Sequence, residues 1–465
     1  MSEKKRLSTR EIFMYFFFIS GIFLLPFTNF DGVNFLREYA REAAIYFWIL
    51  CGGILLVEVF LQKRKVYFPY NSTLVLLFLL FVVWCCFTYL FNFYSIQTNY
   101  FKGRSGTSRF VSQVISLLLP SVFLVYCFWN IIRTWTIRQL LIYLRRIIFY
   151  SFLFVFVYGF VEFVAIQANS EFLKKLLLSL NFLPFVNKEA FYVQRISSVS
   201  FEVPSLGNYL IFVAGWLFSY VLTMKRKGLS LIPTVLLLIL TVISGARAAM
   251  VIVLLQFVLF LIGLFSVKRY RKVRYHIIQI GLVGSLLIAV LFGGKIAKKM
   301  NGQLDFFSVE NNISNQTRYG MQYASLKVFA DHPITGVGFG QNAFHKQKYY
   351  PDWAVTNNYE FEEWYLNEHI PQFPPDFNIY TRLLAETGIV GFLLFLSFLV
   401  LCLKRTYQCM EKGKQEEKVL GLILFISFVG FAVNWLQIDY IRQLGFWLCF
   451  ALLLKLMFNK TIFDR

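Results

Sequence analysis

Long apolar runs separated by short charged breaks make up most of this chain. Many of these runs reach roughly 18 or more residues, which is the length that an α-helix needs to cross a bilayer. Because the runs are continuous rather than alternating, a transmembrane β-barrel is not expected. The pattern predicts an all-α, polytopic membrane protein with about 12 transmembrane helices, at residues 12–30, 43–61, 70–93, 111–132, 147–167, 205–224, 229–244, 248–266, 276–293, 379–403, 419–436 and 442–458.

One long polar stretch interrupts this pattern between the ninth and tenth predicted spans. Residues 294–378 combine many charged residues with Tyr, Trp and Pro, and the chain becomes apolar again from Ile379. A loop of this length between two spans is unusual for a simple connector. We therefore expect spans one to nine in residues 1–293, a large loop in residues 294–378 that covers a site at the membrane surface, and spans ten to twelve in residues 379–465.

Lysine and arginine residues are concentrated in one set of the breaks between spans. The positive-inside rule places such short basic loops in the cytoplasm. This orientation puts both termini in the cytoplasm and the large loop on the outer face of the membrane. The basic breaks are Lys63 to Lys65, Arg133 to Arg146, Lys225 to Lys227, Lys268 to Arg274 and Lys404 to Lys418.

The composition narrows the class of protein further. Of the 465 residues, 58% are hydrophobic and 15% are charged, which excludes a water-soluble globular protein. The net charge is +21, but the basic residues cluster at the ends of the apolar runs, as in contacts with membrane lipids rather than nucleic acid. The seven cysteines show no metal-ligand or disulfide spacing, and no HExxH pattern is present. We therefore expect no metal site and no cofactor.

Several arginines lie on the predicted outer side, where the positive-inside rule disfavours them. Arg247, in ISGARAAM, occupies a break of a few polar residues between two spans, and Arg195 precedes the sixth span in QRISSVSFEVPSLGN. An arginine so close to hydrocarbon is costly unless it snorkels, pairs or faces a wet cavity. Function is the default interpretation for Arg247, with a snorkelling turn residue as the alternative, and Arg195 fits an ordinary loop residue equally well. Arg318 is a further outer arginine, in the large loop.

Arg382 lies one turn into the tenth predicted span. It shares a helical face with Asn378 and Glu386 at i,i+4 spacing. A structural Arg382–Glu386 ion pair explains the glutamate best. Asn378 and Arg382 are both expected to point toward the outer mouth of the protein.

The large loop contains two further patterns and one candidate acid or base. Tyr319, Tyr323 and Leu326 recur at helical spacing, which predicts an amphipathic helix that can lie on the membrane. The glycines of Gly336–Gly340 suit tight packing against the bundle at least as well as phosphate binding. The segment KYYPDWAVTNNYEFEEWY suits either a sugar ring or an interfacial aromatic belt. Among the histidines, only His369 is a candidate acid or base.

Three stretches in this order resemble the O-antigen ligase/polymerase family of bacterial envelope glycan assembly. They are ISGARAAM, TRYGMQYASLKVFADHPITGVGFGQNAF and FNIYTRLLAETGIVGFLLF. The family pattern is an SR-type turn, a loop segment ending in a proline and GxG, and a His-Asn pair followed by a span with Gly-x-x-Gly. Here Asn378 is followed after nine residues by Gly388 and after two more by Gly391. A weaker likeness extends to RISSVSFEVPSLGNYL.

One residue departs from the family pattern. Ligases that attach finished glycan to lipid A-core look as though they need the histidine of the His-Asn pair, and this chain has Phe377 there. Phenylalanine cannot accept a proton, so the resemblance favours a repeat-unit polymerase over a ligase. The general base is then open among Asp376, Glu363, Glu368 and His369.

The resemblance implies a membrane glycosyltransferase of O-antigen lipopolysaccharide or related surface polysaccharide biosynthesis, in the bacterial inner (cytoplasmic) membrane. The donor would be an oligosaccharide on undecaprenyl pyrophosphate, and an acceptor sugar hydroxyl would attack its anomeric carbon. Arg247 and Arg195 would stabilise the leaving diphosphate without a metal ion, with Arg318, Arg382 and Asn378 as further substrate-binding candidates. The family also suggests a chain-length regulator as a partner.

Two other classes of protein compete with this interpretation. A lipid-linked sugar flippase would usually show internal repeats and charges at mid-bilayer. The two halves of the chain show no repeat, and the polar residues gather at one face, which argues against transport. A structural or sensor protein whose outer loop binds a partner is the other alternative.

Overall fold

A computed structural model describes residues 9–62, 67–183, 185–189, 191, 195–223, 227–265 and 312–458. The predicted ninth span, at 276–293, and the first part of the predicted large loop, at 294–311, lie outside the described residues.

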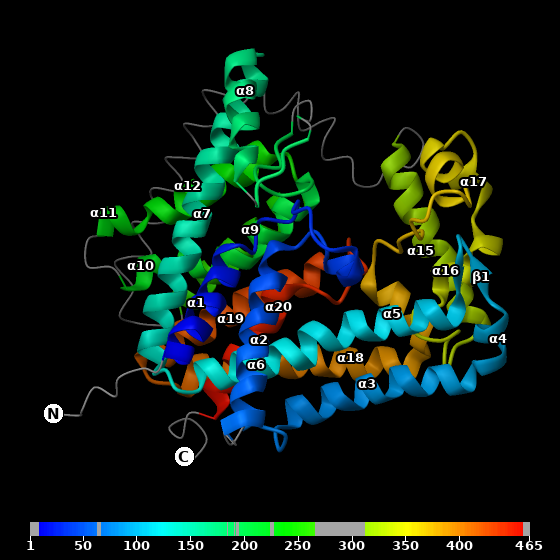
Figure 1. The fold of residues 1–465 in the computed structure, drawn as a ribbon, viewed down its shortest axis with the longest axis horizontal. Helices are drawn as coiled ribbons and strands as arrows, with labels where there is room; N and C mark the ends of the chain where they lie inside the picture. The colour runs from blue at the N-terminus through cyan, green and yellow to red at the C-terminus, as the bar shows by residue number, and fades with distance from the viewer. Residues whose placement is uncertain are drawn as a thin grey trace.

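Most of the described chain is helical (Figure 1), which confirms the predicted all-α class. In this part of the chain the strands are β1 (Tyr100–Phe101) and β2 (Arg104–Ser105), which pair antiparallel. The helical elements are α1 (Thr9–Phe23), η1 (Asn34–Tyr39), α2 (Ala43–Gln62), α3 (Thr73–Phe91), α4 (Phe93–Thr98), α5 (Gly106–Leu118), η2 (Leu119–Leu124), α6 (Val125–Ile132), α7 (Ile137–Gln167), α8 (Glu171–Ser179), η3 (Leu180–Phe182), α9 (Val203–Phe218), α10 (Tyr220–Thr223), α11 (Lys227–Ser230), α12 (Ile232–Ser244), α13 (Arg247–Phe265), α15 (Ile313–Asp331), α16 (Asn342–His345), η5 (Lys346–Tyr349), α17 (Asp352–Val355), η6 (Glu360–Tyr365), α18 (Ile379–Lys412), α19 (Gln415–Asn434) and α20 (Leu444–Met457).

Within the described residues, seven helices are long and apolar enough to cross a membrane, as a polytopic membrane protein requires. Each predicted span in the described part of the chain coincides with a helix, although some ends differ. The first span ends early, at Phe23, because Pro26 disfavours helix in the residues before it. The seven helices are Ala43–Leu61, Thr73–Phe91, Gly106–Ile132, Ile137–Gln167, Val203–Thr223, Arg247–Leu264 and Ile379–Lys412, and shorter apolar helices cover Gly228–Ser244 and Leu444–Met457.

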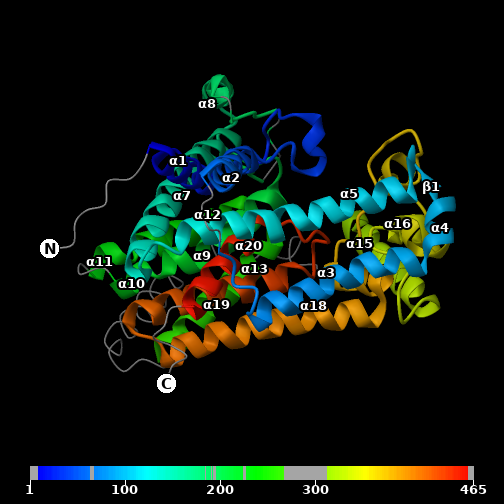
Figure 2. The ribbon, with the colours of Figure 1, turned by 60° about the horizontal axis from the view of Figure 1, so that its bottom comes forward.

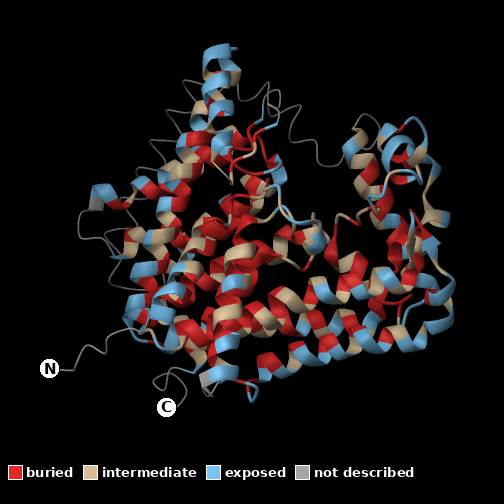
Figure 3. Cartoon of the chain, viewed as in Figure 1, coloured by how far each residue is buried: buried red, intermediate tan, exposed pale blue. Residues whose placement is uncertain are grey.

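The helices pack into a bundle whose longest member is α18. In both views α3, α5 and α18 run alongside one another, from the block of short helices around α15 toward the α18–α19 turn (Figures 1 and 2). On the other side of the bundle, α9 packs against α12, α13 and α19. The buried residues concentrate where these helices meet (Figure 3), and α20 is buried along most of its length.

The segment that follows α15 docks into a break in α18. Gly388 lies inside α18 with a φ of 64°, which interrupts the helical geometry there. The N–H of Ile389 donates to the carbonyl of Pro333 at 2.8 Å, and the N–H of Val337 donates to the carbonyl of Ala385 at 2.9 Å. The large loop is therefore joined to α18 by backbone hydrogen bonds.

The GxGxG pattern serves this docking. Gly336, Gly338 and Gly340 all have positive φ, a region that only glycine enters without strain. A Cβ atom on Gly336 would lie 2.4 Å from the backbone carbonyl carbon of Glu386, so any side chain there would collide with α18. The packing interpretation of these glycines is therefore confirmed.

The predicted loop helix is present as α15, and it packs against the protein through a face other than the stripe that was expected to lie on the membrane. Tyr323 and Leu326 are exposed, whereas the small residues Gly320 and Ala324 and the neighbouring Met321 are buried. Small side chains let α15 approach α17 and η6 closely, and Met321 packs with Ala354, Phe361 and Tyr365 in a separate small core. Some aromatic residues of the segment KYYPDWAVTNNYEFEEWY, namely Phe361 and Tyr365, therefore belong to this core.

Candidate active site

A cavity of about 120 Å³ lies where α5, α18 and the block around α15 meet. Its walls come from segments far apart in the sequence, including η1, the stretch before α18 and the stretch before α20. Most of the lining side chains are charged or polar. They include Glu38, Arg109, Gln113, Phe373, Asp376, Arg382, Glu386, Asp439, Tyr440 and Arg442.

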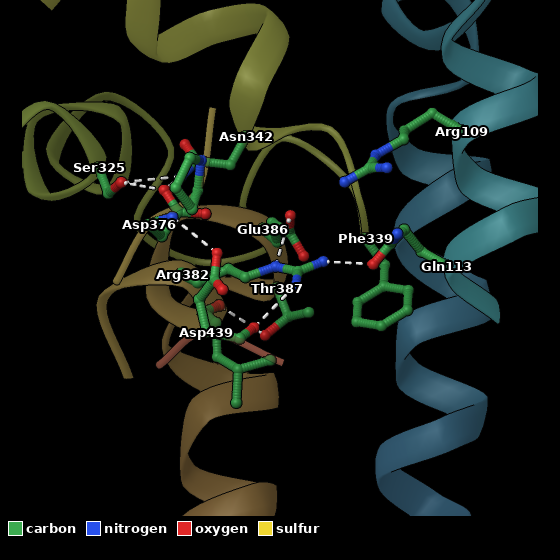
Figure 4. A network of polar contacts seen from close by, with 12 residues as sticks. Arg109, Gln113, Ser325, Phe339, Asn342, Asp376, Arg382, Glu386, Thr387 and Asp439 are labelled. Atoms are coloured by element: carbon green, nitrogen blue, oxygen red, sulfur yellow. Dashed lines mark hydrogen bonds and ion pairs between the residues drawn. The ribbon is translucent and has the colours of Figure 1, made fainter. Parts of the chain in front are cut away.

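Arg382 is the centre of the hydrogen-bond network at this cavity (Figure 4). Its Nε donates to Glu386 Oε1 at 3.1 Å, which confirms the predicted ion pair. Its two terminal nitrogens donate to the carbonyl of Asp439 at 2.8 Å and to Oε1 of Gln113 at 2.7 Å. With each nitrogen engaged, Arg382 joins α5, α18 and the stretch before α20.

Asp376 lies at the edge of the same cavity and is held from several sides. Its Oδ1 accepts hydrogen bonds from Ser325 at 2.7 Å and Asn342 at 2.7 Å, and forms an ion pair with Lys346 at 2.8 Å. Its N–H donates to Oδ2 of Asp439 at 2.6 Å. Asp376 and Lys346 are both buried, so this carboxylate is a fixed anion that ties the loop to the bundle.

The other three proposed bases lie elsewhere. Glu363, Glu368 and His369 are exposed on the surface of the loop, and none of them lines the cavity. The charge of Glu368 acts on Lys102, which lies in the β1–β2 turn. The structure therefore brings Asp376 to the cavity and does not bring the other three there.

Asn378 caps the N-terminus of α18. Its side chain accepts from the N–H groups of Tyr380 at 2.9 Å and Thr381 at 3.3 Å, and its Nδ2 donates to Gln322 at 3.4 Å. Capping of this kind satisfies backbone donors that a helix start leaves open. Asn378 is thus a structural residue here and does not line the cavity.

A second charged feature consists of Arg195, Arg247 and Arg318, whose charges act on one another, and we call it the arginine group. The loop before α9 carries Arg195, the turn between α12 and α13 carries Arg247, and α15 carries Arg318. The N–H of Ile196 donates to the carbonyl of Ser244 at 3.3 Å, which joins the first two segments directly. Burial and the charge of Arg247 both lower the pKa of Arg195.

Arg318 completes the arginine group from the loop side. Its Cζ lies 5.1 Å from the centroid of the Phe377 ring, within the range of a cation–π contact. Burial lowers the pKa of Arg318. The positive charge of Arg247 lowers this pKa further, whereas the negative charge of Glu360 raises it. Among the described residues, no hydrogen bond or ion pair engages the guanidinium of any member of the arginine group. This group differs in that respect from Arg382.

A buried ion pair fixes the loop that carries Arg195. Glu162, on α7, accepts from Lys188 at 2.5 Å and from the N–H of Ser198 at 2.8 Å. Lys188 also donates to the Ser197 hydroxyl at 2.8 Å. Glu162 is fully buried and Lys188 nearly so, which anchors this loop inside the bundle.

Two further charged residues at the cavity escaped the sequence interpretation. Glu38, on η1, forms ion pairs with Arg442 and, at 3.5 Å, with Arg109. Burial alone would raise the pKa of Glu38, but the charges of Arg442, Arg109 and Arg382 outweigh it and lower the pKa to about 2. No local motif marks Glu38 or Arg442, because their partners lie on distant segments of the chain.

Glu202 also escaped the sequence interpretation, although it lies in the quoted stretch RISSVSFEVPSLGNYL. It directly precedes Val203, the first residue of α9. Val203 packs with Ala246 and Ala249, which flank Arg247, so Glu202 adjoins the arginine group. The sequence signal that could have indicated Glu202 is a carboxylate close to Arg195 and directly before a span whose first turn contains a proline.

A central part of the chain, residues 232–396, matches the family model described as O-antigen ligase. This part of the chain is therefore similar to the O-antigen ligase family. This region contains Arg247, Arg318, Asp376 and Arg382, whereas Arg195 and Glu202 precede it. The match supports a function of the O-antigen ligase/polymerase type and does not separate ligase from polymerase. No curated protein matches the chain.

Proposed function

We propose that this protein polymerises lipid-linked oligosaccharide repeat units of O-antigen or a related surface polysaccharide. The donor is an oligosaccharide on undecaprenyl pyrophosphate, and the acceptor is a sugar hydroxyl of a second repeat unit. The observation that carries the proposal is the arginine group, in which three guanidinium groups come from separate segments and none, among the described residues, takes part in a hydrogen bond or ion pair. Unpaired guanidinium groups are suited to bind a dianionic diphosphate through charge-assisted, bidentate hydrogen bonds.

The chemistry of glycosyl transfer explains why such a group is needed. As the bond between the anomeric carbon and the diphosphate breaks, negative charge develops on the leaving oxygen. Fixed cations stabilise this charge more in the transition state than in the ground state, which lowers the barrier. Arginine keeps its proton even where burial lowers its pKa, because its ordinary pKa lies far above neutral pH. We propose that the transfer needs no metal ion for this step.

Phe377 favours a polymerase over a ligase. The resembling ligases have a histidine at this position, whereas here the ring covers Arg318 and offers no proton acceptor. The ligase activity remains the second candidate because the matching family model is described as O-antigen ligase. Among the bases considered from the sequence, Asp376 is the one at the cavity, and its Oδ1 is already engaged by Ser325, Asn342 and Lys346.

The proposed reaction also implies an orientation in the membrane. The loop of residues 294–378 would face the outer side of the bacterial inner membrane, with both termini in the cytoplasm, as the basic breaks indicate. Lipid-linked repeat units and a chain-length regulator would then meet the enzyme on that outer side. A lipid-linked sugar flippase would instead leave the repeat units on the inner side when it is lost.

Glycan profiles of a host strain without this protein test the proposal. Loss of a polymerase leaves a single repeat unit on the lipid A-core, and loss of a ligase leaves none. We expect the single-unit profile, restored to a ladder by the wild-type gene and by Arg138→Ala, an exposed arginine far from the site. Arg247→Ala, expressed at the wild-type level, should fail to restore it. A normal ladder from Arg247→Ala would contradict the proposal.

A further inference from the structure

Glu202 adjoins the arginine group, and its charge also acts on a residue that lines the cavity. Val203, the next residue, shares a small apolar cluster with Ala246 and Ala249 on either side of Arg247. On its other sides, the charge of Glu202 acts on Arg318, on Tyr365 of η6, and on Tyr440, which lines the cavity. The carboxylate thus adjoins both the cationic group and the cavity.

The backbone around Glu202 is fixed, although the side chain is accessible. The N–H of Phe201 donates to the Thr28 hydroxyl at 3.1 Å, and the Ser200 hydroxyl donates to the carbonyl of Pro26 at 2.8 Å. The carbonyl of Glu202 itself accepts the first hydrogen bond of α9, from Leu206 at 3.2 Å. The side chain, in contrast, is exposed. A fixed main chain with an accessible carboxylate is what proton transfer to a bound substrate requires.

Three carboxylates that line the cavity are already engaged. Asp376 is held by Lys346 and two further donors, Glu38 is paired with two arginines, and Glu386 is paired with Arg382. Within the described residues, no hydrogen bond or short ion pair holds the Glu202 carboxylate, and the charge that acts on it is that of Arg318. Glu360 also acts on Arg318, but the charge of Glu202 acts in addition on Tyr440, which lines the cavity. Glu202 is therefore the unengaged carboxylate that is close to both the arginine group and the cavity.

We propose that Glu202 is the general base of the transfer, an inference that rests on the proposed function. The Glu202 carboxylate takes the proton of the acceptor hydroxyl while the acceptor oxygen forms a bond to the anomeric carbon of the donor. The bond from that carbon to the diphosphate oxygen breaks, and its electron pair leaves with undecaprenyl diphosphate at the arginine group. The protonated Glu202 then returns its proton to water, which regenerates the base.

The electrostatic surroundings of Glu202 suit this role. Burial of the surrounding region raises its pKa, and the charge of Arg318 acts in the opposite direction. A raised pKa makes a carboxylate a stronger base. Tyr365 and Tyr440 face it as neutral groups, since burial raises the pKa of both phenols. The transfer rate should therefore fall when the pH drops through the pKa of Glu202.

The test uses full-length protein in membranes, with lipid-linked repeat units extracted from a host strain that lacks this protein. Glu202→Gln keeps the size of the side chain and cannot accept the proton. We expect it to slow glycan transfer by about 100-fold to 10,000-fold and to abolish the acidic limb of the pH–rate profile. Glu202→Asp should retain part of the rate together with an acidic limb. Glu416→Gln, an exposed glutamate distant in sequence from the site, is the matched control and should behave as wild type.

Binding of undecaprenyl diphosphate separates a catalytic from a structural loss. Glu202→Gln should bind this lipid as wild type does, because the arginine group is intact. Lost binding, or a Glu202→Gln rate and acidic limb equal to wild type, would overturn the role of Glu202. If the wild-type protein itself transfers no glycan from the extracted donor, the proposed function fails instead.

Discussion

The guanidinium of Arg318 lies over the ring of Phe377, with 5.1 Å between Cζ and the ring centroid. Arg318 comes from α15 and Phe377 from the stretch just before α18, so the contact joins the large loop to the bundle. The aromatic face places the charge without consuming any of the hydrogen-bond donors of Arg318. Those donors remain available for a ligand, as the proposed grip on a diphosphate requires.

Replacement of Phe377 tests this positioning. Phe377→Ala removes the ring and should weaken the binding of undecaprenyl diphosphate by about 2-fold to 30-fold, since cation–π contacts contribute roughly 0.5 to 2 kcal/mol. Phe377→Tyr keeps an aromatic face and should bind as wild type. Titration of the purified variants with the lipid checks both expectations, and equal affinity of wild type and Phe377→Ala would refute the positioning role.

The Glu162–Lys188 pair should respond differently to single and double substitution. Glu162→Gln or Lys188→Met leaves one buried partner uncompensated and should lower the free energy of unfolding by roughly 3 to 5 kcal/mol. The double variant Glu162→Leu/Lys188→Met removes both charges and should recover much of that stability. It should not recover glycan transfer, because the loop that carries Arg195 loses its anchor.

Thermal unfolding of the detergent-purified variants, together with transfer assays, separates these effects. Single variants that melt at the wild-type temperature would show that the pair does not hold the loop. A double variant with full transfer activity would show that the anchor is dispensable.

Gly388 should tolerate no side chain. A Cβ atom there would lie 2.1 Å from the carbonyl oxygen of Ile334, and its φ of 64° is strained for other residues. Gly388→Ala should therefore destabilise the protein by at least about 1 to 3 kcal/mol and loosen the large loop. Gly53, on α2, has open space around it, so Gly53→Ala should be neutral or slightly stabilising. Thermal unfolding and protease digestion of the loop distinguish the two, and similar behaviour of both variants would contradict the docking argument.

Glu38 should contribute stability that depends on pH. Its pKa is lowered from 4.5 to about 2 because the charges of Arg442, Arg109 and Arg382 outweigh burial. A depressed carboxyl pKa stabilises the folded state above the unfolded pKa, by roughly 3 kcal/mol here, and this contribution is lost as the pH falls from about 4.5 to about 2.

Glu38→Gln removes this contribution at every pH. The difference in melting temperature between wild type and Glu38→Gln should therefore be largest near neutral pH and shrink below about pH 4.5. A difference that stays constant down to acidic pH would indicate that the Glu38 ion pairs do not provide the stability.

The helical spans were predictable because apolar runs report directly on membrane helices, and the spans within the described residues coincide with helices. The Arg382–Glu386 pair was predictable because both residues lie on one helix at a fixed spacing. The site was less predictable. Glu38 and Arg442 meet only after the chain folds, and nothing in their local sequence indicates the contact.

The loop helix illustrates a second limit of sequence patterns. The stripe of Tyr323 and Leu326 was expected to lie on the membrane and is exposed, but nothing in the sequence analysis predicted the buried face of α15, which consists of small residues such as Gly320 and Ala324. Close approach between helices depends on small side chains, which carry little hydrophobic signal. Glu202 was overlooked for a related reason, since a single glutamate in a loop carries no periodic pattern at all.

Binding of undecaprenyl diphosphate to the purified protein tests the central claim about the arginine group most directly. Arg195→Ala, Arg247→Ala and Arg318→Ala should each weaken binding by about 10-fold to 150-fold, the effect of losing a hydrogen-bonded charge worth roughly 1.5 to 3 kcal/mol. Arg138→Ala should leave binding unchanged. If all three variants bind the lipid as tightly as wild type, the arginine group does not hold the diphosphate.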